Sequence, residues 1–254
     1  MADLVYGINP VREGLQSSRR RPLELFLLRE GKGSRLEELS RMAQLNGVPI
    51  RTRERQDLDR LAGHSQHQGA LLRLEPFPFE DLGRLLEQWR RSDRPAFFLL
   101  LDGITDPHNL GALLRSADAA GCHGVILPKD RAAPVTGVVD KASAGALEHI
   151  PLCRVTNLAR TIDELKKEGV WVYGLAGEGS ESIYQTDLSG DIALVVGSEG
   201  SGLRPNVQRH CDSLLTIPMG GHVGSLNASV AGGVAMFEVL RQRVGRPSDR
   251  FIPS

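Results

Sequence analysis

Short apolar runs that alternate with helical segments are the feature of this sequence that most restricts its fold. Each run after residue 96 is continuous, without the polar alternation of a strand that faces water on one side. Such strands are buried on both faces, and helices between them let neighbouring strands run parallel. The sequence therefore predicts an α/β fold, a parallel sheet with helices on both faces. The predicted strands are Phe97–Leu101, Val125–Leu127, Val170–Leu175, Ile192–Val196 and Leu214–Ile217.

Three segments between or after these runs have helical periodicity. The first begins at Asn109, a good N-cap, carries apolar residues at i, i+3, i+4 and i+7, and stops at Gly121. The second spans Asn157 to Lys167. The third, Asn227 to Arg243, is rich in alanine and glycine, which permits close packing of backbones.

A proline-rich break divides the chain into two parts. The sequence Glu75-Pro76-Phe77-Pro78-Phe79 suits neither a helix nor a central strand, and an amphipathic segment, Asp81–Trp89, follows it. Residues before the break alternate apolar runs with charged stretches, as a small α/β unit does. The predicted limits are 1–75 for an N-terminal domain, 76–93 for a linker, 94–246 for the larger domain and 247–254 for a tail.

Composition excludes several classes of protein. The chain has 31 Lys+Arg and 31 Asp+Glu, so its net charge is zero, and 41% of its residues are hydrophobic, enough for a packed core. Its three cysteines, Cys122, Cys153 and Cys211, form no CxxC pair, which argues against a disulfide framework or a zinc cluster. With no membrane-spanning run and no signal peptide, we expect a cytoplasmic protein that contacts no membrane.

Three glycine-rich or polar loops follow predicted strands, at the carboxyl edge where parallel sheets bind ligands. They are residues 102–109, which lead into the helix carrying Arg115, residues 197–203 with Glu199, and residues 217–227 with His222. Each loop also has an interpretation without a functional role. Arg115 would form a surface ion pair with Asp118, the second loop would be a mobile glycine turn, and His222 would be a loop histidine with no function. No metal site is expected, because His64 and His67 have no carboxylate or cysteine at ligand spacing.

The order of glycines in the second loop disfavours two common enzyme classes. It reads G-x-x-G-x-G, which is neither the phosphate loop of nucleotide hydrolases nor the fingerprint of nicotinamide-dependent oxidoreductases. No serine lies in G-x-S-x-G, so an esterase nucleophile is disfavoured as well.

Taken in order, the loops resemble the three signature motifs of the SpoU (TrmH-type) RNA ribose 2′-O-methyltransferases, of the SPOUT superfamily. The motifs are DGITDPHNLGALLRSADAAG, VVGSEGSGLRP and IPMGGHVGSLNASVAGGVAMFE, and the resemblance covers residues 97–243. The N-terminal part, with Tyr6-Gly7, Asn9-Pro10-Val11 and His67-Gln68-Gly69, is similar to the RNA-binding domain of the RlmB branch, whose fold is like that of ribosomal protein L30e. That branch modifies a guanosine of 23S rRNA.

The resemblance implies a mechanism and a set of site residues. It implies S-adenosylmethionine as methyl donor, RNA as substrate, a homodimer and a C-terminal trefoil knot. The glycine at position 197 is expected to leave room for the purine of the donor. The implied cofactor-binding residues are Gly197, Ile217, Leu226, Met219 and Gly177, and the implied catalytic residues are Arg115, Asn109, Glu199, Ser225 and Asn227.

The implied roles leave the proton acceptor open. A guanidinium stays protonated and suits bidentate contact with phosphate, so Arg115 is expected to hold the phosphate beside the target ribose. Proton removal would then run through that phosphate or through a transiently neutral guanidine. Glu199 is expected to orient Arg115 or the loop, and Ser225 and Asn227 are expected to hold the ribose or to shape the third loop. Glu199 as general base is the competing hypothesis. Two other functions stay open, a transfer-RNA ribose methyltransferase and a non-catalytic RNA-binding protein on the same scaffold.

Overall fold

The computed structural model describes residues 3–244 except 17–19, 30–32, 136 and 180. The predicted tail, 247–254, lies outside the described residues. The chain forms two compact units, each considered by itself. The first contains Met1–Pro78 and Val135–Glu148, and the second contains Phe79–Pro134 and the chain from His149 onward.

The first unit is built on a four-stranded mixed sheet of order β1-β4-β2-β3. Strands β1 and β2 pair antiparallel with β4, and β3 pairs parallel with β2. Leucines of β2 and β4 pack with α1 and α2 in a core that includes Leu25, Leu39 and Leu72, all fully buried. The elements are β1 (Asp3–Tyr6), α1 (Ile8–Gln16), β2 (Pro22–Leu28), α2 (Ser34–Leu45), β3 (Ile50–Arg53), α3 (Arg55–Ala62) and β4 (Ala70–Leu74).

A segment distant in sequence completes the first unit. Helix α6 (Gly137–Ser143) and the short helix η1 (Ala146–Glu148) group with the N-terminal residues rather than with their neighbours in sequence. Buried Arg20 donates to both carboxylate oxygens of Asp140, at 2.9 and 3.1 Å, and to Glu148 at 3.3 Å. The domain limits predicted from sequence assign this segment to the larger domain, because they follow chain order alone.

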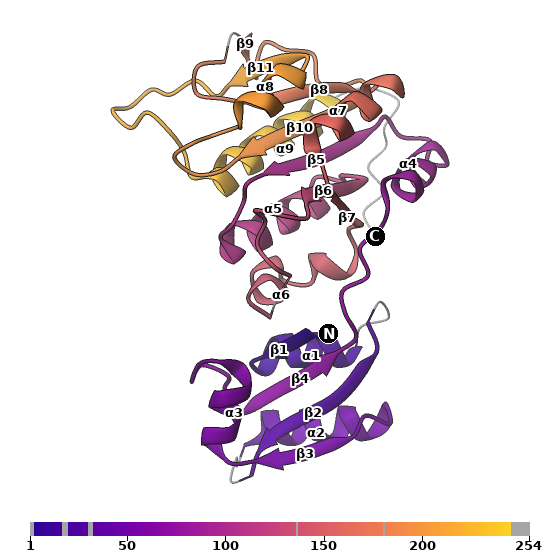
Figure 1. Cartoon of the computed structure of the whole chain (residues 1–254), viewed down its shortest axis with the longest axis vertical. Helices are drawn as coiled ribbons and strands as arrows, with labels where there is room; N and C mark the ends of the chain where they lie inside the picture. Colours follow the sequence, from indigo (N-terminus) through magenta and orange to yellow (C-terminus); the bar gives the residue numbers. More distant parts are fainter. Residues whose placement is uncertain (1–2, 17–19, 30–32, 136, 180, 245–254) are drawn as a thin grey trace. The chain divides into compact units, whose positions relative to one another are not determined.

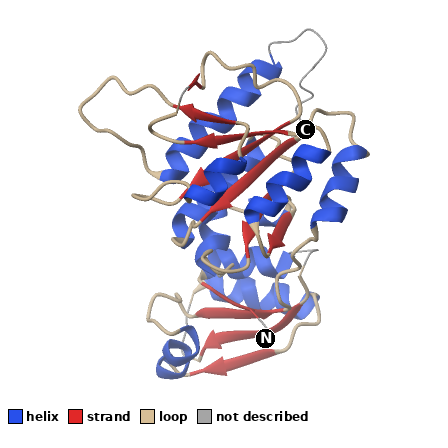
Figure 2. Ribbon diagram, turned by 45° about the horizontal axis from the view of Figure 1, so that its top comes forward, coloured by secondary structure: helices blue, strands red, loops and turns tan. Residues whose placement is uncertain are grey.

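The second unit contains a seven-stranded sheet of order β7-β6-β5-β10-β8-β11-β9. Within the described residues, the neighbouring strands of this sheet all pair parallel, and helices cover both faces (Figures 1 and 2). The parallel α/β fold is thereby confirmed. The strands are β5 (Phe97–Asp102), β6 (Gly124–Pro128), β7 (Leu152–Val155), β8 (Trp171–Leu175), β9 (Glu181–Ser182), β10 (Ile192–Gly197) and β11 (Ser213–Thr216). The helices are α4 (Leu82–Arg90), α5 (Pro107–Ala119), α7 (Leu158–Lys167), α8 (Pro205–His210) and α9 (Ala228–Val244).

Strand β10 shows how one apolar run serves both faces of the sheet. Ala193 and Val195 pack in the cluster that α4, α7 and α8 cover. Val196 points to the opposite face, where a Cβ on Gly232 of α9 would lie 3.3 Å from it and 2.5 Å from Leu113 of α5. Helices α5 and α9 thus cross closely on that face, as the small residues of α9 predict.

The N-terminus of α5 differs from the sequence-based expectation. Asn109 was expected to cap the helix, but the helix starts at Pro107 and its cap is Asp106. The Asp106 carboxylate accepts hydrogen bonds from the backbone N–H groups of His108 and Asn109, at 3.1 and 3.4 Å. Proline is favoured at the first helical position because its missing N–H has no partner there anyway. Asn109 therefore lies inside the first turn, with its side chain available for other contacts.

The topology places the three predicted loops along one edge. β5 and β10 are neighbours, and Gly197 pairs with Asp102 at their carboxyl ends. From β5 the chain runs outward through β6 to β7, whereas β8, β10 and β11 lie on the other side of β5. The junction of β5 and β10 is therefore the switch point at which such sheets bind ligands. No helix in the described ranges is long and apolar enough to cross a membrane.

Candidate active site

A cavity of about 840 Å³ opens at the carboxyl ends of β8, β10 and β11. The second and third predicted loops form most of its wall, and the third is the long loop between β11 and α9 at the left of Figure 1. Its lining includes all five residues implied for cofactor binding, namely Gly177, Gly197, Ile217, Met219 and Leu226. Three of the implied catalytic residues, Glu199, Ser225 and Asn227, line it as well.

The side chain of Asn227 connects all three loops. Its amide nitrogen donates to Oδ1 of Asn109 at 3.0 Å and also to a carboxylate oxygen of Glu199. Asn109 lies in the first turn of α5, and its side chain is buried. Asn227 lies at the end of the third loop, and Glu199 lies in the second. In the sequence, Asn109 precedes Asn227 by 118 positions and Glu199 precedes it by 28, so the network joins distant parts of the chain.

Asn227 has a second role as the cap of α9. Its Oδ1 accepts from the backbone N–H groups of Ser229 and Val230, at 2.9 and 3.3 Å, and from the Ser229 hydroxyl at 2.6 Å. Serine and asparagine are both good caps by residue type, and of Ser225 and Asn227 it is Asn227 that caps this helix. Because its oxygen is engaged by the helix, its nitrogen must point to the loops.

Arg115 lies outside this cavity. It is exposed on α5, and within the described part of the chain it makes no hydrogen bond or ion pair. The pairing with Asp118, the alternative to a functional role for Arg115, therefore does not form. Within a single chain, Asn109, Glu199 and Asn227 contact one another and Ser225 lines the cavity. Arg115 does not belong to this group.

The fold of the second loop itself requires glycine at position 197. A Cβ there would lie 2.2 Å from the carbonyl carbon of Gly202 and 2.4 Å from the backbone nitrogen of Leu203. Ser198 and Gly202 exchange backbone hydrogen bonds at 3.1 and 3.0 Å, which folds the loop back on its own strand. The loop itself excludes a side chain at 197. At Gly177, by contrast, a Cβ would meet nothing within 4 Å.

Sequence reasoning missed the pair that anchors the second loop. Asp102 is a fully buried carboxylate at the end of β5 and accepts from both the backbone N–H and the Nε–H of Arg204, at 2.8 and 2.6 Å. A charged residue directly after a continuous apolar run was the available signal, because buried carboxylates need a partner.

His67 and His222 have different surroundings. Buried His67 contacts a carboxylate oxygen of Asp59 at 2.9 Å through Nε2 and accepts from the backbone N–H of Gly69 through Nδ1 at 3.0 Å. His222 is exposed in the third loop. Across the residues that the structure describes, no three His, Cys, Asp or Glu side chains gather as metal ligands would.

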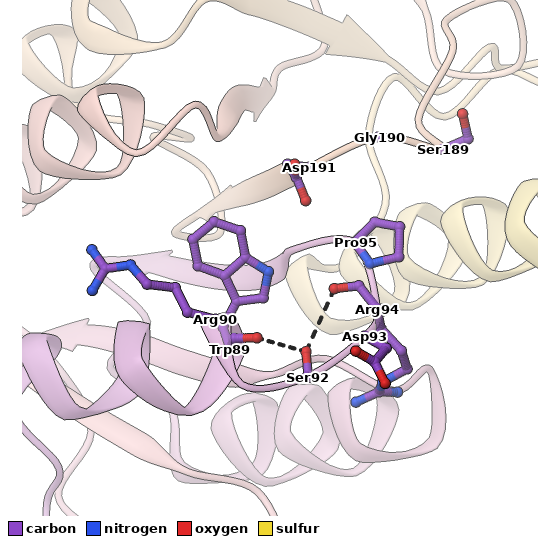
Figure 3. Close-up of a pocket in the computed structure, with 9 residues that line it drawn as sticks. All are labelled: Trp89, Arg90, Ser92, Asp93, Arg94, Pro95, Ser189, Gly190 and Asp191. Atoms are coloured by element: carbon purple, nitrogen blue, oxygen red, sulfur yellow. Dashed lines mark hydrogen bonds between the residues drawn. The ribbon is translucent and has the colours of Figure 1, made fainter.

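Another hollow, of about 520 Å³, lies at the opposite edge of the sheet, before β5 and β10 (Figure 3). Its polar groups are mostly engaged in the fold. Ser92 donates to the carbonyl of Trp89 at 2.7 Å, Asp191 accepts from the backbone N–H of Ala96 at 2.6 Å, and Arg90 pairs with Glu168 at 2.5 Å. None of the three predicted loops reaches it.

Comparison with known proteins agrees with the geometry of the carboxyl edge. Residues 96–237 match the model of the SpoU rRNA Methylase family. Residues 4–80 match a second model, described as RNA 2′-O ribose methyltransferase substrate binding. The first match contains all three loops, and the second covers the N-terminal part of the first unit.

Two curated relatives and one solved structure illustrate the similarity. The 23S rRNA (guanosine-2′-O-)-methyltransferase RlmB of Escherichia coli K12 is 46% identical over 246 residues, 96% of this chain and 100% of the relative. The same-named protein of Shewanella oneidensis is 47% identical over 244 residues, 95% and 98%. The SpoU methyltransferase AviRb of Streptomyces viridochromogenes, solved with AdoMet, has a TM-score of 0.81 at 25% identity, covering 96% of this chain and 91% of its own. Matched over more than half its length by the family model and nearly throughout by these relatives, this chain belongs to the SpoU rRNA Methylase family.

Proposed function

We propose that this protein transfers a methyl group from S-adenosylmethionine to the ribose 2′-hydroxyl of a guanosine in 23S rRNA. The observation that carries the proposal is the Asn109–Asn227–Glu199 network at the mouth of the glycine-lined cavity. The relatives named RlmB support the reaction and the substrate. The match of residues 4–80 to a substrate-binding model supports an RNA substrate, and the relatives named RlmB favour ribosomal RNA over transfer RNA. Acting on ribosomal RNA, the protein would work in the cytoplasm.

The cavity fits the proposed methyl donor. Its volume lies within the roughly 300–1,000 Å³ of small-molecule sites. Open space at Gly177 lets a ligand lie against the backbone, and Met219 and Leu226 add exposed apolar surface. The Thr216 hydroxyl donates to the carbonyl of Gly177 at 3.2 Å and joins two walls of the cavity. When bound, S-adenosylmethionine supplies an electrophilic methyl group on a sulfonium.

The chain's own residues position the acceptor hydroxyl. Asn227 holds one carboxylate oxygen of Glu199, and the second oxygen is available to accept the ribose hydroxyl or to orient it. The buried amide of Asn109 fixes Asn227 from behind. Held in this way, the groups need no reorganisation when the hydroxyl attacks, and such positioning can contribute about 7–11 kcal/mol in favourable cases. Ser225 on the cavity wall adds a hydroxyl for the ribose.

Arg115 completes the proposal through a second copy of the chain. The exposed apolar side chains of α9, Val230, Phe237 and Val244, are spaced by seven residues and lie on one face. Such a face favours a homodimer. Arg115 belongs to α5, the helix packed beside α9, so it would lie at this interface and grip an RNA phosphate at the partner's cavity. Family membership also supports a C-terminal trefoil knot, and the two family matches support a division of the chain near the predicted linker, 76–93; we retain both as proposals.

Mapping of ribose methylation in ribosomal RNA tests the proposal. In RNA from cells that lack the gene, one 2′-O-methylguanosine of 23S rRNA should disappear, and the wild-type gene should restore it. An unchanged 23S rRNA profile with a missing transfer-RNA methyl group would instead support the transfer-RNA alternative. No change in either RNA would support the non-catalytic alternative.

A further inference from the structure

A third cavity, of about 380 Å³, lies next to the candidate active site at the same edge of the sheet. The ends of β6 and β7, the first turn of α7 and the start of α8 form its wall. We call it the Arg131–Arg204 cavity after its two arginines. Nothing in the proposed mechanism uses it.

Side chains with hydrogen-bond donors line this cavity. Arg131 is exposed and, within the described ranges, makes no ion pair, and Arg204 is partly exposed. Asn157 uses its Oδ1 to cap α7 by accepting from the backbone N–H of Arg160 at 3.3 Å, which leaves its amide nitrogen as a donor. Asn206 adds a second amide. Amide donors and guanidinium groups in one cavity suit the oxygens of a phosphate, which accept hydrogen bonds and carry negative charge.

Arg204 is fixed in position from behind. The buried carboxylate of Asp102 accepts from its backbone N–H and from its Nε–H, and Nη2 lies 2.6 Å from the same carboxylate, so Asp102 fixes the guanidinium at the cavity wall. Asp102 neutralises part of this charge, and exposed Asp130 lies on the cavity wall beside Arg131. Binding would therefore rest on directed donors and on the free charge of Arg131, rather than on a large net positive charge.

The position of the cavity indicates its ligand. Leu203 lines the candidate active site and the next residue, Arg204, lines this cavity, so the second loop separates the two. This cavity lies at the ends of β6 and β7, the candidate active site lies at the ends of β10, β8 and β11, and β5 separates the two sets of strands in the sheet. At about 4.8 Å between neighbouring strands, the centres of the two sets are roughly 15–20 Å apart, a span of a few nucleotides of extended RNA.

We propose that the Arg131–Arg204 cavity binds a backbone phosphate of the RNA substrate close to the methylated nucleotide. The proposal rests on the proposed function, since it assumes that RNA enters the neighbouring site. A phosphate held here positions the chain without reading its sequence. It sets which part of the strand lies over the Asn109–Asn227–Glu199 network.

Three substitutions change the charge of the cavity in opposite directions. Arg131→Gln removes a cation, Asn206→Asp adds an anion of nearly the same shape, and Asp130→Asn removes an anion. Asn206→Asp places an acidic side chain in the first turn of α8, where such side chains favour a helix, so weaker RNA binding by this variant cannot be attributed to a weakened α8. Arg91→Gln, at an exposed arginine just after α4, is the matched control for loss of one charge.

The measurements use the full-length protein, S-adenosylmethionine and an unmodified 23S rRNA transcript. Arg131→Gln and Asn206→Asp should each raise KM for RNA about fivefold with kcat within twofold, and Asp130→Asn should lower KM. In filter binding, Arg131→Gln should reduce the slope of log affinity against log salt by about 0.7–0.9, the share of one phosphate contact. Affinity for S-adenosylmethionine, measured by calorimetry, should not change.

Two results would overturn the proposal. The first is that Arg131→Gln and Asp130→Asn have the same KM for RNA, and the same salt dependence of RNA binding, as the control Arg91→Gln. The second is that Arg131→Gln lowers kcat and leaves KM unchanged. Both are distinct from failure of the proposed function, in which the wild-type protein transfers no methyl group. Salt-dependent filter binding still tests the cavity in that case, because it needs no turnover.

Discussion

At the residue scale, one asparagine performs two separable tasks. The oxygen of the Asn227 side chain caps α9, and its nitrogen ties Asn109 to Glu199. Asparagine is one of the few residues that can do both, because it carries an acceptor and donors on one planar group. Sequence reasoning identified Asn109, Glu199 and Asn227 through the resemblance, whereas the cap of α5 was assigned to Asn109 because Asp106 and Asn109 are equally good caps by type.

Substitution of Asn227 by Asp separates the two tasks. Asp keeps the acceptor for α9, so helix content and melting temperature should match the wild type. It removes the bridging donor and places a carboxylate against Glu199, so kcat should fall at least about 100-fold, as when a positioned donor is removed from a site. Asn227→Ala is the control, because it should lose activity and also about 1 kcal/mol of stability. Near-normal kcat in Asn227→Asp would contradict the positioning role.

His123 makes stability dependent on pH. Burial, with the nearby Arg94 and Arg243 charges, lowers the pKa of His123 to about 4. Its Nδ1 accepts from the backbone N–H of Phe97 at 3.1 Å, which requires the neutral ring. Since the unfolded chain takes up this proton near pH 6.5 and the folded chain near pH 4, stability falls as pH decreases between these values.

Urea unfolding at pH 7 and pH 5 measures this effect. The ring is partly exposed, so we expect a loss of about 1 kcal/mol from this group in the wild type. In His123→Asn, the decrease in the free energy of unfolding from pH 7 to pH 5 should be smaller than in the wild type by about 1 kcal/mol. An equal loss in both proteins would show that His123 does not carry the pH dependence.

At the scale of elements, the crossing of α5 and α9 depends on one glycine more than on its neighbour. A Cβ on Gly232 would lie 2.5 Å from a methyl of Leu113, whereas a Cβ on Gly233 would lie 3.7 Å from the Ser116 hydroxyl. Gly232→Ala should therefore cost about 1–3 kcal/mol of stability through overpacking. Gly233→Ala should be neutral or stabilising by up to about 1 kcal/mol, since alanine favours a helix. Thermal unfolding compares them, and equal effects would contradict the packing described.

The elements that sequence reasoning found have long apolar runs or clear periodicity. β5 and β10 are buried at every position, so their sequences read as continuous runs. β7 was missed because it has only four residues, one of them an arginine, and because it lies at the edge of the sheet. α6 was missed because Gly137 and two consecutive valines do not predict a helix. The local sequence pattern predicts an element poorly where contacts with residues distant in the sequence determine its structure.

At the scale of the whole molecule, the first unit depends on a segment that the sequence places far away. Arg20 lies among Asp140 and Glu148, and Asp140 is itself buried. Burial raises the pKa of Asp140, and Arg20 opposes that shift. No pattern in either segment predicts this pairing, because it spans 120 positions.

Removal of Arg20 tests this dependence. Arg20→Ala leaves the Asp140 carboxylate buried without its cation, so stability should fall by about 3–5 kcal/mol. The double variant Arg20→Ala, Asp140→Asn removes the uncompensated charge and should regain part of that loss. Urea denaturation measures both variants, and a double variant no more stable than Arg20→Ala would show that the charge pair does not link the segments.

Methyl transfer by the purified protein tests the central claim most directly. Wild-type protein, S-adenosylmethionine with a labelled methyl group and unmodified 23S rRNA are incubated, and the label is located by nuclease mapping. We predict label on the 2′-oxygen of a single guanosine ribose, and at least about 100-fold slower labelling by Asn227→Asp. Label on a base, or equal labelling by the two proteins, would contradict a site built on the Asn109–Asn227–Glu199 network.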